Sequence, residues 1–302
     1  MKPLLDSDIL FYEIGASGQF LDERTGELVV RDFDYVADLF DQRIKEICAE
    51  VWATEPPVLY ITNNRRLHKK VNKKLKKEGK SEIEFQPNFR DKVAKKEEYK
   101  GKRPSEKPFH YDNLVAYALG KYECRVAVGM EADDLLSADQ WARVKEGHLD
   151  TIICSRDKDL RITPGMHFGW PCGRQPQYGP RRVSELGELV LTTKKGMSKG
   201  KEIELHKLTG NGLKFFYSQV LTGDKTDNYP GIPGCGPVTT FTALDPCETE
   251  EELFNAVSNL YKAKYEDLWR EEMQEQCQLA WMVRELTEEG QPVMYTMYDE
   301  RT

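Results

Sequence analysis

The fold of this chain is constrained most by a series of short apolar segments that run directly into carboxylates. Amphipathic segments lie between them. The first, residues 2–10, contains Asp6 and Asp8 and is interpreted as a buried strand that delivers carboxylates to a sheet edge. Residues 32–52 follow with apolar side chains at helical spacing, and residues 58–61 form a second expected strand. This strand–helix–strand order predicts an α/β fold with a mainly parallel central sheet.

The same alternation continues along the chain and then weakens. It predicts a helix around 114–119, a strand at 126–128, a helix at 131–146 and a strand at 151–154. Residues 161–212 are rich in Gly, Pro and Lys; a hairpin at 192–205 around Lys194-Lys195-Gly196 is expected there, and no chemistry is assigned. Helices are expected at 213–221, 250–262 and 266–286. We therefore predict one domain over residues 1–210 and a helical region over residues 211–302.

Charge is distributed unevenly. The net charge is −7, yet residues 64–107 hold 17 Lys or Arg against 7 Asp or Glu. Few apolar residues interrupt this basic segment, so it is interpreted as a helix-and-loop excursion from the sheet over about 63–110. Taken alone, the segment fits a phosphate-binding surface and a solvated loop equally.

Composition excludes several other classes of protein. The seven cysteines are spread along the chain with no C-x-x-C pair, which indicates neither a disulfide framework nor a zinc site. No apolar run has the length of a membrane span, and the N-terminus lacks the features of a secretory signal. A cytosolic location and no membrane partner are expected.

Close carboxylates occur in four separate places, and each pair alone would be an ordinary cap or turn. Asp6 and Asp157 directly follow short strands, and ligand sites in parallel sheets lie at the carboxyl ends of strands. Glu131 and Asp134 stand three apart and share a helix face, whereas Asp133 points elsewhere and binds through water unless the helix begins there. The four groups are Asp6 with Asp8, Glu131 with Asp133 and Asp134, Asp157 with Asp159, and Asp224 with Asp227.

Crowded carboxylates repel one another unless a cation neutralises them, so the set indicates hard metal ions with oxygen ligands. Magnesium or manganese fits, since these segments contain no His. Two such ions about 4 Å apart support phosphodiester hydrolysis.

Five motifs in this order resemble the flap endonucleases, including the 5′ nuclease part of bacterial DNA polymerase I and the short replicative exonucleases of phages. The resemblance runs from about residue 4 to residue 240. It implies a PIN-like or resolvase-like domain with a helical arch, followed by a helix-hairpin-helix (helix–three-turn–helix) element at about 219–240. The motifs are Asp6-Ser-Asp8, Tyr99-Lys100-Gly-Lys-Arg103, Glu131-Ala-Asp133-Asp134, Ser155-Arg-Asp157-Lys-Asp159, and Gly223-Asp224 through Asp227 to Gly236.

The resemblance also implies roles for individual residues. Tyr99, Lys100 and Arg103 match the arch, where a base stacks and the scissile phosphate is contacted, so the two cations are expected to be catalytic. Lys69 and Lys73 of the basic segment would bind the DNA strand. Gly231, Gly234 and Gly236 match the hairpin that holds duplex phosphates and commonly a potassium ion. The expected metal ligands are Asp6, Glu131, Asp133, Asp134, Asp157, Asp159, Asp224 and Asp227.

Two positions depart from the family pattern. Thr62-Asn63-Asn64 stands where an aspartate ligand is usual, which weakens magnesium binding at one subsite, and Val238 replaces a phosphate-binding lysine. The first hypothesis is a structure-specific 5′-to-3′ exonuclease or flap endonuclease of phage or bacterial replication. It would act on duplex, nicked or flapped DNA and on RNA–DNA hybrids, with replisome proteins as partners. The alternatives are a DNA-binding homologue without cleavage, prompted by Asn63, and an RNA-directed nuclease, which the hairpin motif disfavours.

Overall fold

A six-stranded sheet forms the centre of the protein in the computed structural model, which describes all residues except 64, 83, 103–105, 174, 199–200 and 302. The strand order is β5-β4-β1-β6-β7-β8, and every neighbouring pair is parallel except β7 with β8. This confirms the α/β class with a mainly parallel sheet. The strands are β1 (Lys2–Asp6), β4 (Val58–Thr62), β5 (Glu123–Ala127), β6 (Thr151–Cys154), β7 (Gly165–Gly169) and β8 (Tyr178–Val183).

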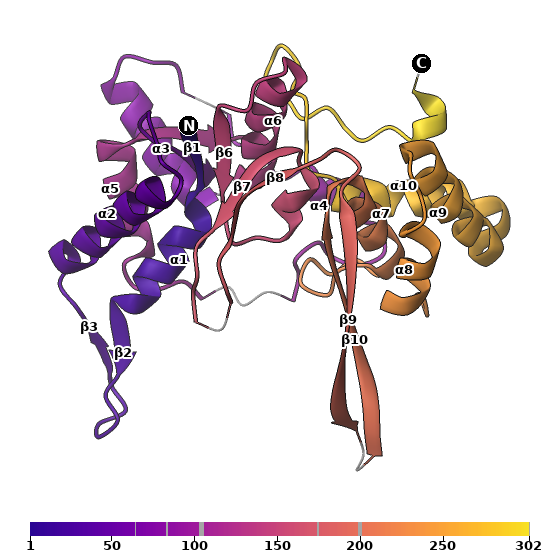
Figure 1. The fold of residues 1–302 in the computed structure, drawn as a ribbon. Coiled ribbons are helices and arrows are strands. Elements are labelled where there is room, and N and C mark those ends of the chain that lie inside the picture. The colour runs from indigo at the N-terminus through magenta and orange to yellow at the C-terminus, as the bar shows by residue number, and fades with distance from the viewer. Residues whose placement is uncertain (64, 83, 103–105, 174, 199–200, 302) are drawn as a thin grey trace.

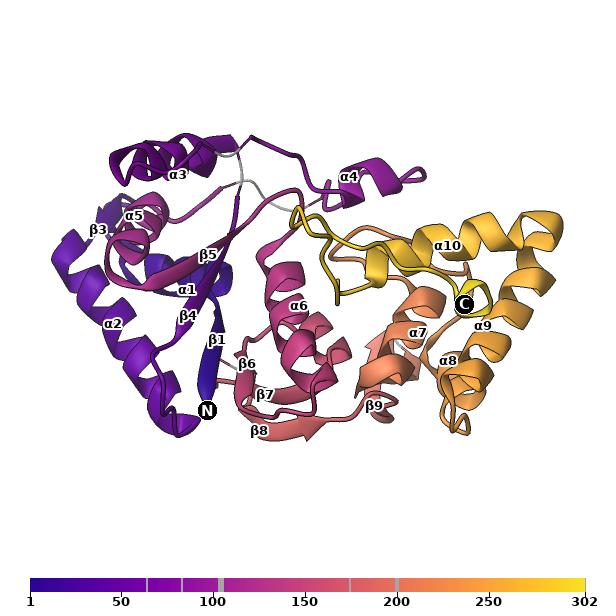
Figure 2. The ribbon, with the colours of Figure 1, turned by 90° about the horizontal axis from the view of Figure 1, so that it is seen from above.

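Helices cover both faces of this sheet (Figures 1 and 2). Leu5 packs in one buried cluster with α1 (Ser7–Ser17), α2 (Phe33–Glu50) and α5 (Tyr111–Lys121), while its neighbour Leu4 packs in the other with α6 (Ala132–Lys145). Successive strand residues point to opposite faces, so an apolar strand of this kind needs cover on both sides. Burial on both faces explains why these strands appear in the sequence as unbroken apolar runs.

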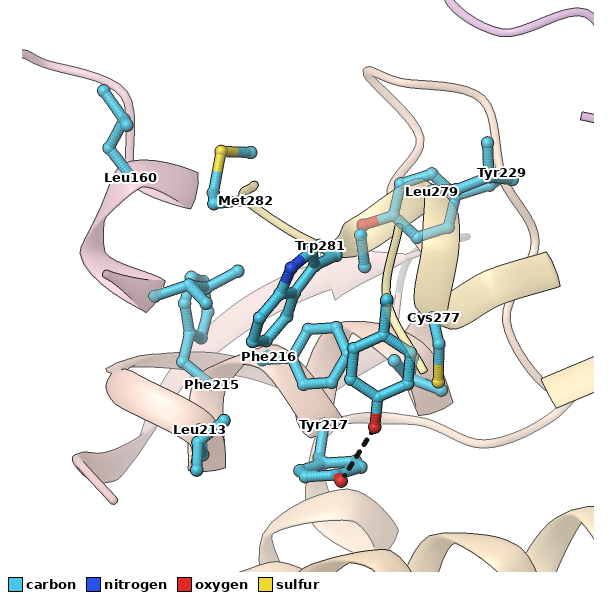
Figure 3. Packing of buried hydrophobic residues seen from close by; sticks show 14 of the residues in the cluster. Leu160, Leu213, Phe215, Phe216, Tyr217, Tyr229, Cys277, Leu279, Trp281 and Met282 are labelled. Carbon is cyan, nitrogen blue, oxygen red and sulfur yellow. Dashed lines mark hydrogen bonds between the residues drawn. The ribbon is translucent and has the colours of Figure 1, made fainter. Parts of the chain in front are cut away.

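The C-terminal region is helical, as the sequence predicts, and packs on the α6 side. Its elements are α7 (Gly212–Thr222), α8 (Pro237–Leu244), α9 (Glu250–Tyr265) and α10 (Trp269–Ala280), with 3-10 turns η2 (Glu266–Leu268) and η3 (Tyr298–Glu300). A further 3-10 turn, η1 (Asp159–Ile162), follows β6. Figure 3 shows its centre, where Phe216 meets Trp281 edge-on at 5.0 Å and the hydroxyls of Tyr217 and Tyr295 lie 3.0 Å apart. These residues share one buried cluster with Leu4. The domain division at residue 210 stays a prediction.

Two hairpins extend away from the sheet and helices (Figure 1). They are β2 (Gln19–Leu21) with β3 (Leu28–Val30), and β9 (Glu188–Ser198) with β10 (Lys201–Asn211). The expected turn at Lys194-Lys195-Gly196 is wrong, because these residues lie within β9. Gly196 is not a turn glycine: a Cβ there would come within 2.5 Å of the Leu205 side chain across the ladder, so the missing side chain leaves room for Leu205.

The basic segment leaves the sheet after β4 as α3 (Arg65–Lys77), continues through α4 (Arg90–Val93) and returns at α5. Lys69 and Lys73 are exposed on α3. No helix in the described part of the chain is both long and apolar enough to cross a membrane.

Several expected element boundaries are wrong; the strand expected at 126–128, for example, is β5, which runs from Glu123 to Ala127. The strand expected at 2–10 ends at Asp6, and helix α1 begins at Ser7 because the Asp6 side chain accepts a hydrogen bond from the Ile9 amide, 3.4 Å away. The last helix ends at Ala280 and not near 286; the apolar residues that follow, such as Trp281 and Val283, are buried in extended backbone.

Candidate functional site

The first carboxylates lie at the point where the strand order of the sheet reverses. From β1 the chain builds outward through β4 and β5, then returns to the other side of β1 with β6. Such a switch point leaves a crevice at the carboxyl ends of the two strands. Asp6 ends β1, and Ser155 to Asp157 follow β6, whose Cys154 pairs with Leu5. The sheet topology therefore brings residues 6 and 155–157 to one edge.

A network of hydrogen bonds fixes these side chains. The Ser155 hydroxyl donates to Asp6 Oδ2 over 2.7 Å, and the Asp157 amide donates to Ser155 Oγ over 2.9 Å. Asp8, in the first turn of α1, accepts at Oδ2 from the Thr62 amide at 3.2 Å. Its Oδ1 is buried with no hydrogen-bond partner in the described structure. A buried oxygen of this kind normally accepts a hydrogen bond from protein or water, or contacts an ion.

The start of α6 supplies the next acids and corrects one expectation. Glu131 is the N-cap residue, so Asp133 lies in the first helical turn and lines the hollow described below. Asp134 faces the interior: both its oxygens bind the Arg90 guanidinium, at 2.5 and 2.8 Å, and it also accepts from the Val283 amide. Asp133 therefore follows the exception allowed for a helix that begins at the acidic motif, whereas Asp134 faces away from the hollow that Glu131 lines.

Expected metal ligands from three chain segments line one hollow with a volume of about 1230 Å³. Cations and aromatic rings border it: Lys100 and Arg156 contribute positive charge, and Tyr12, Phe109 and Tyr111 contribute rings. Gln19 of the β2–β3 hairpin lies on the same rim, where its side-chain oxygen accepts from the Phe109 amide at 2.8 Å. The expected ligands in the lining are Asp6, Asp8, Glu131, Asp133 and Asp157, and the carboxylates of Glu13 and Glu106 line it as well.

Burial and mutual repulsion perturb these acids. Burial raises the pKa of Asp6 to about 7, and the nearby charges of Asp8 and Asp157 add to the increase against a hydrogen bond from Ser155. Burial also raises the pKa of Asp8 and, together with repulsion by Asp6 and Asp157, that of Asp133. A cation among these oxygens would relieve the cost of their ionisation.

Glu131 behaves in the opposite way. Burial alone would raise its pKa, but Lys100 and Arg90 lower the pKa to about 2. The Lys100 ammonium binds Glu131 Oε1, and the Tyr99 hydroxyl lies 3.0 Å from Glu131 Oε2 and 3.1 Å from Asp227 Oδ2. The Tyr99 ring is only 7% exposed, so it links two carboxylates and in this arrangement offers no face to a base.

The other expected ligands form a second group beside the hollow. Lys158 bridges Asp159 and Asp224, with its ammonium 2.8 Å from Asp159 Oδ1 and 2.6 Å from Asp224 Oδ2. Gln219 also donates to Asp159. The Asp157 carboxylate accepts from the Asp159 amide at 2.9 Å, which ties this group to the first. Asp159, Asp224, Asp227 and Asp134 do not belong to the lining of the hollow.

The oxygen-only donor set, the unpartnered Asp8 oxygen and the raised pKa values of the lining acids all suit a hard divalent cation. Within the described residues, however, no three acidic, His or Cys side chains converge closely enough to hold a metal ion as they stand. The donors surround the hollow without closing on one point.

The remaining expected residues are placed as follows. Arg103 lies outside the described residues. The Asn63 side chain is buried 3.3 Å from His68 Nδ1 and does not line the hollow, whereas Thr62 does. The Gly231 amide donates to Gln276 Oε1 at 2.9 Å, and a Cβ on Gly231 would collide with the Gly223 amide at 2.3 Å. Gly231 thus has a packing role.

Gly234 is exposed with φ +87°, and Gly236 is the N-cap of α8. The turn lies between two helices, as expected. The amides at this end of α8 are therefore the part of the hairpin that points out of the protein core.

Sequence reasoning missed Tyr12 and Phe109, which are 41% and 64% exposed beside the carboxylates. Helical spacing would have found Tyr12, since it stands one turn after Asp8 and shares its face. That signal was lost because residues 2–10 were interpreted as a strand. Phe109 has no such signal: it lies in the chain between the basic segment and α5.

Comparison with known proteins gives relatives of one kind. No protein-family model matches the chain. DNA polymerase I of Rhizobium leguminosarum is 29% identical over 144 residues, and that of Lactococcus lactis is 26% identical over 165 residues. These matches cover 47% and 53% of this chain but 12% and 16% of the relatives, so the chain spans a small part of their length. They agree with the resemblance to the 5′ nuclease part of DNA polymerase I.

Solved structures similar to the chain include a bacteriophage T5 flap endonuclease in a product complex with DNA and metal ions, at 13% identity and TM-score 0.45, covering 92% of this chain and 98% of that one. The T5 5′-exonuclease with zinc bound has 12% identity, TM-score 0.46 and coverage of 93% and 100%. The catalytic core of Rad2 with a DNA substrate has 14% identity, TM-score 0.41 and coverage of 99% and 84%. With TM-scores below 0.5 these similarities carry no weight for the fold, which rests on the sheet order above.

Proposed function

We propose that this protein is a divalent-metal-dependent nuclease that hydrolyses phosphodiesters at 5′ ends of duplex, nicked or flapped DNA. One observation carries the proposal: five of the expected metal ligands, which come from three separate chain segments, line a single hollow and share it with Lys100. An acidic surface on an acidic protein would not place Asp6, Asp133 and Asp157 together at the switch point of the sheet.

Asp6, Asp8, Glu131, Asp133 and Asp157 would hold the first magnesium or manganese ion. Such an ion supplies Lewis-acid activation of a water and of the phosphoryl oxygens. Asp134 is a positioning residue, because its bonds to Arg90 and to the Glu131 amide fix the start of α6. The pair Asp159 and Asp224 would contribute to a second ion, which would compete there with the Lys158 ammonium.

Lys100 is the cation at the mouth of the hollow and would stabilise negative charge developing on the phosphoryl group. Its backbone is held in place, since its amide donates to the Asp227 carbonyl at 3.0 Å and the Asn228 side chain donates to the Glu98 carbonyl at 2.9 Å. Arg103 would act beside it. The exposed rings of Tyr12 and Phe109 would take the stacking role that buried Tyr99 does not fill.

The substrate would be held through its backbone and recognised by structure. Lys69 and Lys73 on α3 would contact phosphates of the strand, and the amides near Gly234 and Gly236 would contact phosphates of the duplex, while main-chain carbonyls of the same hairpin would hold a potassium ion. Contacts of this kind do not read bases, so RNA primers paired with DNA and replication proteins belong to the proposed context.

The test is release of nucleotides from a 5′-labelled nicked duplex with magnesium. Wild type should release them, Asp157→Asn should not, and the exposed Asp150→Asn should resemble wild type. Tight binding without product in wild type would instead indicate the non-cleaving homologue. Binding of neither duplex nor flap would refute the proposal.

A further inference from the structure

A second hollow adjoins the carboxylate site and is lined by cations. Its volume is about 650 Å³, and it shares Ile9, Arg156 and Asp157 with the first hollow. Arg161 stacks on the ring of Tyr178, with 3.8 Å between guanidinium and ring centroid. The basic side chains in its lining are Arg156, Lys158, Arg161 and Lys207. Lys158 is paired with Asp159 and Asp224, and Arg156 with Glu13, so the positive charge that this hollow adds beside Asp157 comes mainly from Arg161 and Lys207.

The β9–β10 hairpin forms one side of this basic hollow and continues outward from it (Figure 1). Lys207 pairs with Thr192, and Leu205 pairs with Lys194. Cross-strand partners point to the same face of a ladder, and alternate residues of a strand share a face. Lys194 and Lys207 therefore lie on the face that begins at the basic hollow, about two residues apart along the ribbon.

The two faces of the hairpin differ in charge. Among the described positions from 190 to 209 that share the Lys207 face, the sequence has no Asp or Glu. Both acids of this stretch, Glu202 and Glu204, are on the other face. There Lys195 pairs with Glu202 at 2.8 Å, and His206 Nε2 lies 3.8 Å from Glu204 Oε2. Over residues 190–209 one face is thus cationic, whereas the other carries Lys195 and His206 beside two glutamates. Glu188, at the base of the cationic face, is paired with Arg181 at 2.6 Å.

We propose that the Lys194–Lys207 face and the basic hollow together bind the phosphate backbone of the duplex part of the nucleic acid substrate. The inference rests on the proposed function for the identity of the ligand. It assigns a role to a segment, residues 161–212, that the motifs leave without one.

Two features favour a duplex over a single strand. Eleven residues in each strand give the ribbon a reach of roughly 35 Å, which corresponds to about ten base pairs of a stiff duplex. Over the described residues 190–198 and 201–209 the Lys207 face has no aromatic residue on which unpaired bases would stack. In the basic hollow the ring of Tyr178 is covered by Arg161, and Trp170 is only 3% exposed. Contact through lysines to phosphates holds the duplex without reading its sequence.

Neighbouring lysines on opposite faces provide a matched pair of variants. Lys194→Glu and Lys195→Glu change the same charge on the same strand, and both side chains are exposed. Binding of the full-length protein to a labelled duplex and to a single strand of equal length is measured by fluorescence anisotropy in EDTA, which prevents hydrolysis. Circular dichroism melting verifies that each variant is folded.

Lys194→Glu should weaken duplex binding about tenfold and Lys195→Glu less than about twofold, with single-strand affinity changed by neither. Lys207→Gln, a milder second variant, should lower the slope of log K against log salt by about 1. The inference is overturned if Lys194→Glu and Lys195→Glu weaken duplex binding equally, or if neither weakens it. It is also overturned if Lys194→Glu weakens binding of the single strand as much as binding of the duplex. If wild type cleaves normally in those cases, the proposed function stands; if wild type neither binds nor cleaves DNA, both fail.

Discussion

Arg90 and Asp134 form a completely buried ion pair with two hydrogen bonds, although they are 44 positions apart in the chain. Arg90 also donates to the carbonyl oxygens of Leu279 and Trp281, at 3.1 and 2.5 Å. One guanidinium therefore joins the basic segment, the start of α6 and the end of α10. The position of Glu131 and Asp133 depends on this junction.

Removal of the Arg90 guanidinium should lower the free energy of unfolding of the protein. Arg90→Leu leaves the Asp134 charge buried without its partner, which costs about 3–5 kcal/mol of unfolding free energy. Arg143→Leu breaks exposed pairs with Asp150 and Glu146 and should cost about 1 kcal/mol or less. Urea unfolding of both variants makes the comparison. Equal losses would show that the buried pair has no special part in stability, and Arg90→Leu/Asp134→Leu should recover much of the loss.

Asp6 should make the metal-free protein less stable as pH rises. Its folded pKa of about 7, raised by burial and by Asp8 and Asp157, exceeds the unfolded value of 3.8, so the folded state holds the proton more tightly. The resulting stability is present below pH 3.8 and lost as pH rises through 7.

Asp6→Asn, which cannot ionise, should therefore be more stable than wild type at pH 8 in EDTA, on the order of 1–4 kcal/mol, with the gain shrinking toward pH 4. Urea unfolding at several pH values measures this, with Asp150→Asn as the exposed control. A difference between Asp6→Asn and wild type that is independent of pH would argue against the raised pKa.

Lys100 should contribute to the rate and not only to structure. Lys100→Ala should lower kcat about 10²- to 10³-fold, because a cation aimed at the phosphoryl group is lost. It should also move the acid limb of the pH–rate profile upward, since Lys100 helps lower the pKa of Glu131. Lys102→Ala removes an exposed lysine that lies two residues from Lys100 and pairs with Glu97, and it should leave kcat and the profile unchanged. Similar losses in both variants would mean that only the positive charge of the loop matters.

Tyr12 should hold the nucleotide at the hollow through its ring. Tyr12→Ala should weaken substrate binding by about 1–3 kcal/mol, and Tyr12→Phe should retain most of the affinity because stacking needs no hydroxyl. Tyr35 is similarly exposed but lies outside the hollow, so Tyr35→Ala serves as control. Anisotropy titration of a 5′-labelled flap measures the four proteins. Unchanged affinity in Tyr12→Ala would remove the ring from the site.

The sequence predicted the sheet and the strand-end acids well, because those depend on local pattern. Residues 151–154 form a strand with the predicted bounds, and Asp6 and Asp157 follow strands as their positions indicated. The order of the strands, which places β6 beside β1, is a tertiary property that no local spacing contains. It decides which acids meet.

The orientations of Asp133 and Asp134 depend on the residue at which helix α6 begins. Asp133 lines the hollow and Asp134 is buried because helix α6 begins at residue 132, and the partner that captures Asp134 is Arg90, far away in sequence. Burial of Tyr99 likewise depends on a distant residue, Asp227. The β9–β10 hairpin was expected, but with its turn in the wrong place. Glycine is common in turns, yet Gly196 lies within β9, where the missing side chain leaves room for Leu205 on the other strand.

Binding of the metal itself tests the central claim most directly. Manganese is titrated calorimetrically into wild type, Asp133→Asn, Asp157→Asn and the control Asp150→Asn at neutral pH, and the same samples are assayed for release of nucleotides from a nicked duplex. Saturable binding in wild type and the control, with binding and cleavage lost together in Asp133→Asn and Asp157→Asn, is the predicted result. Cleavage by wild type without bound metal, or undiminished binding and cleavage in both hollow variants, would contradict it.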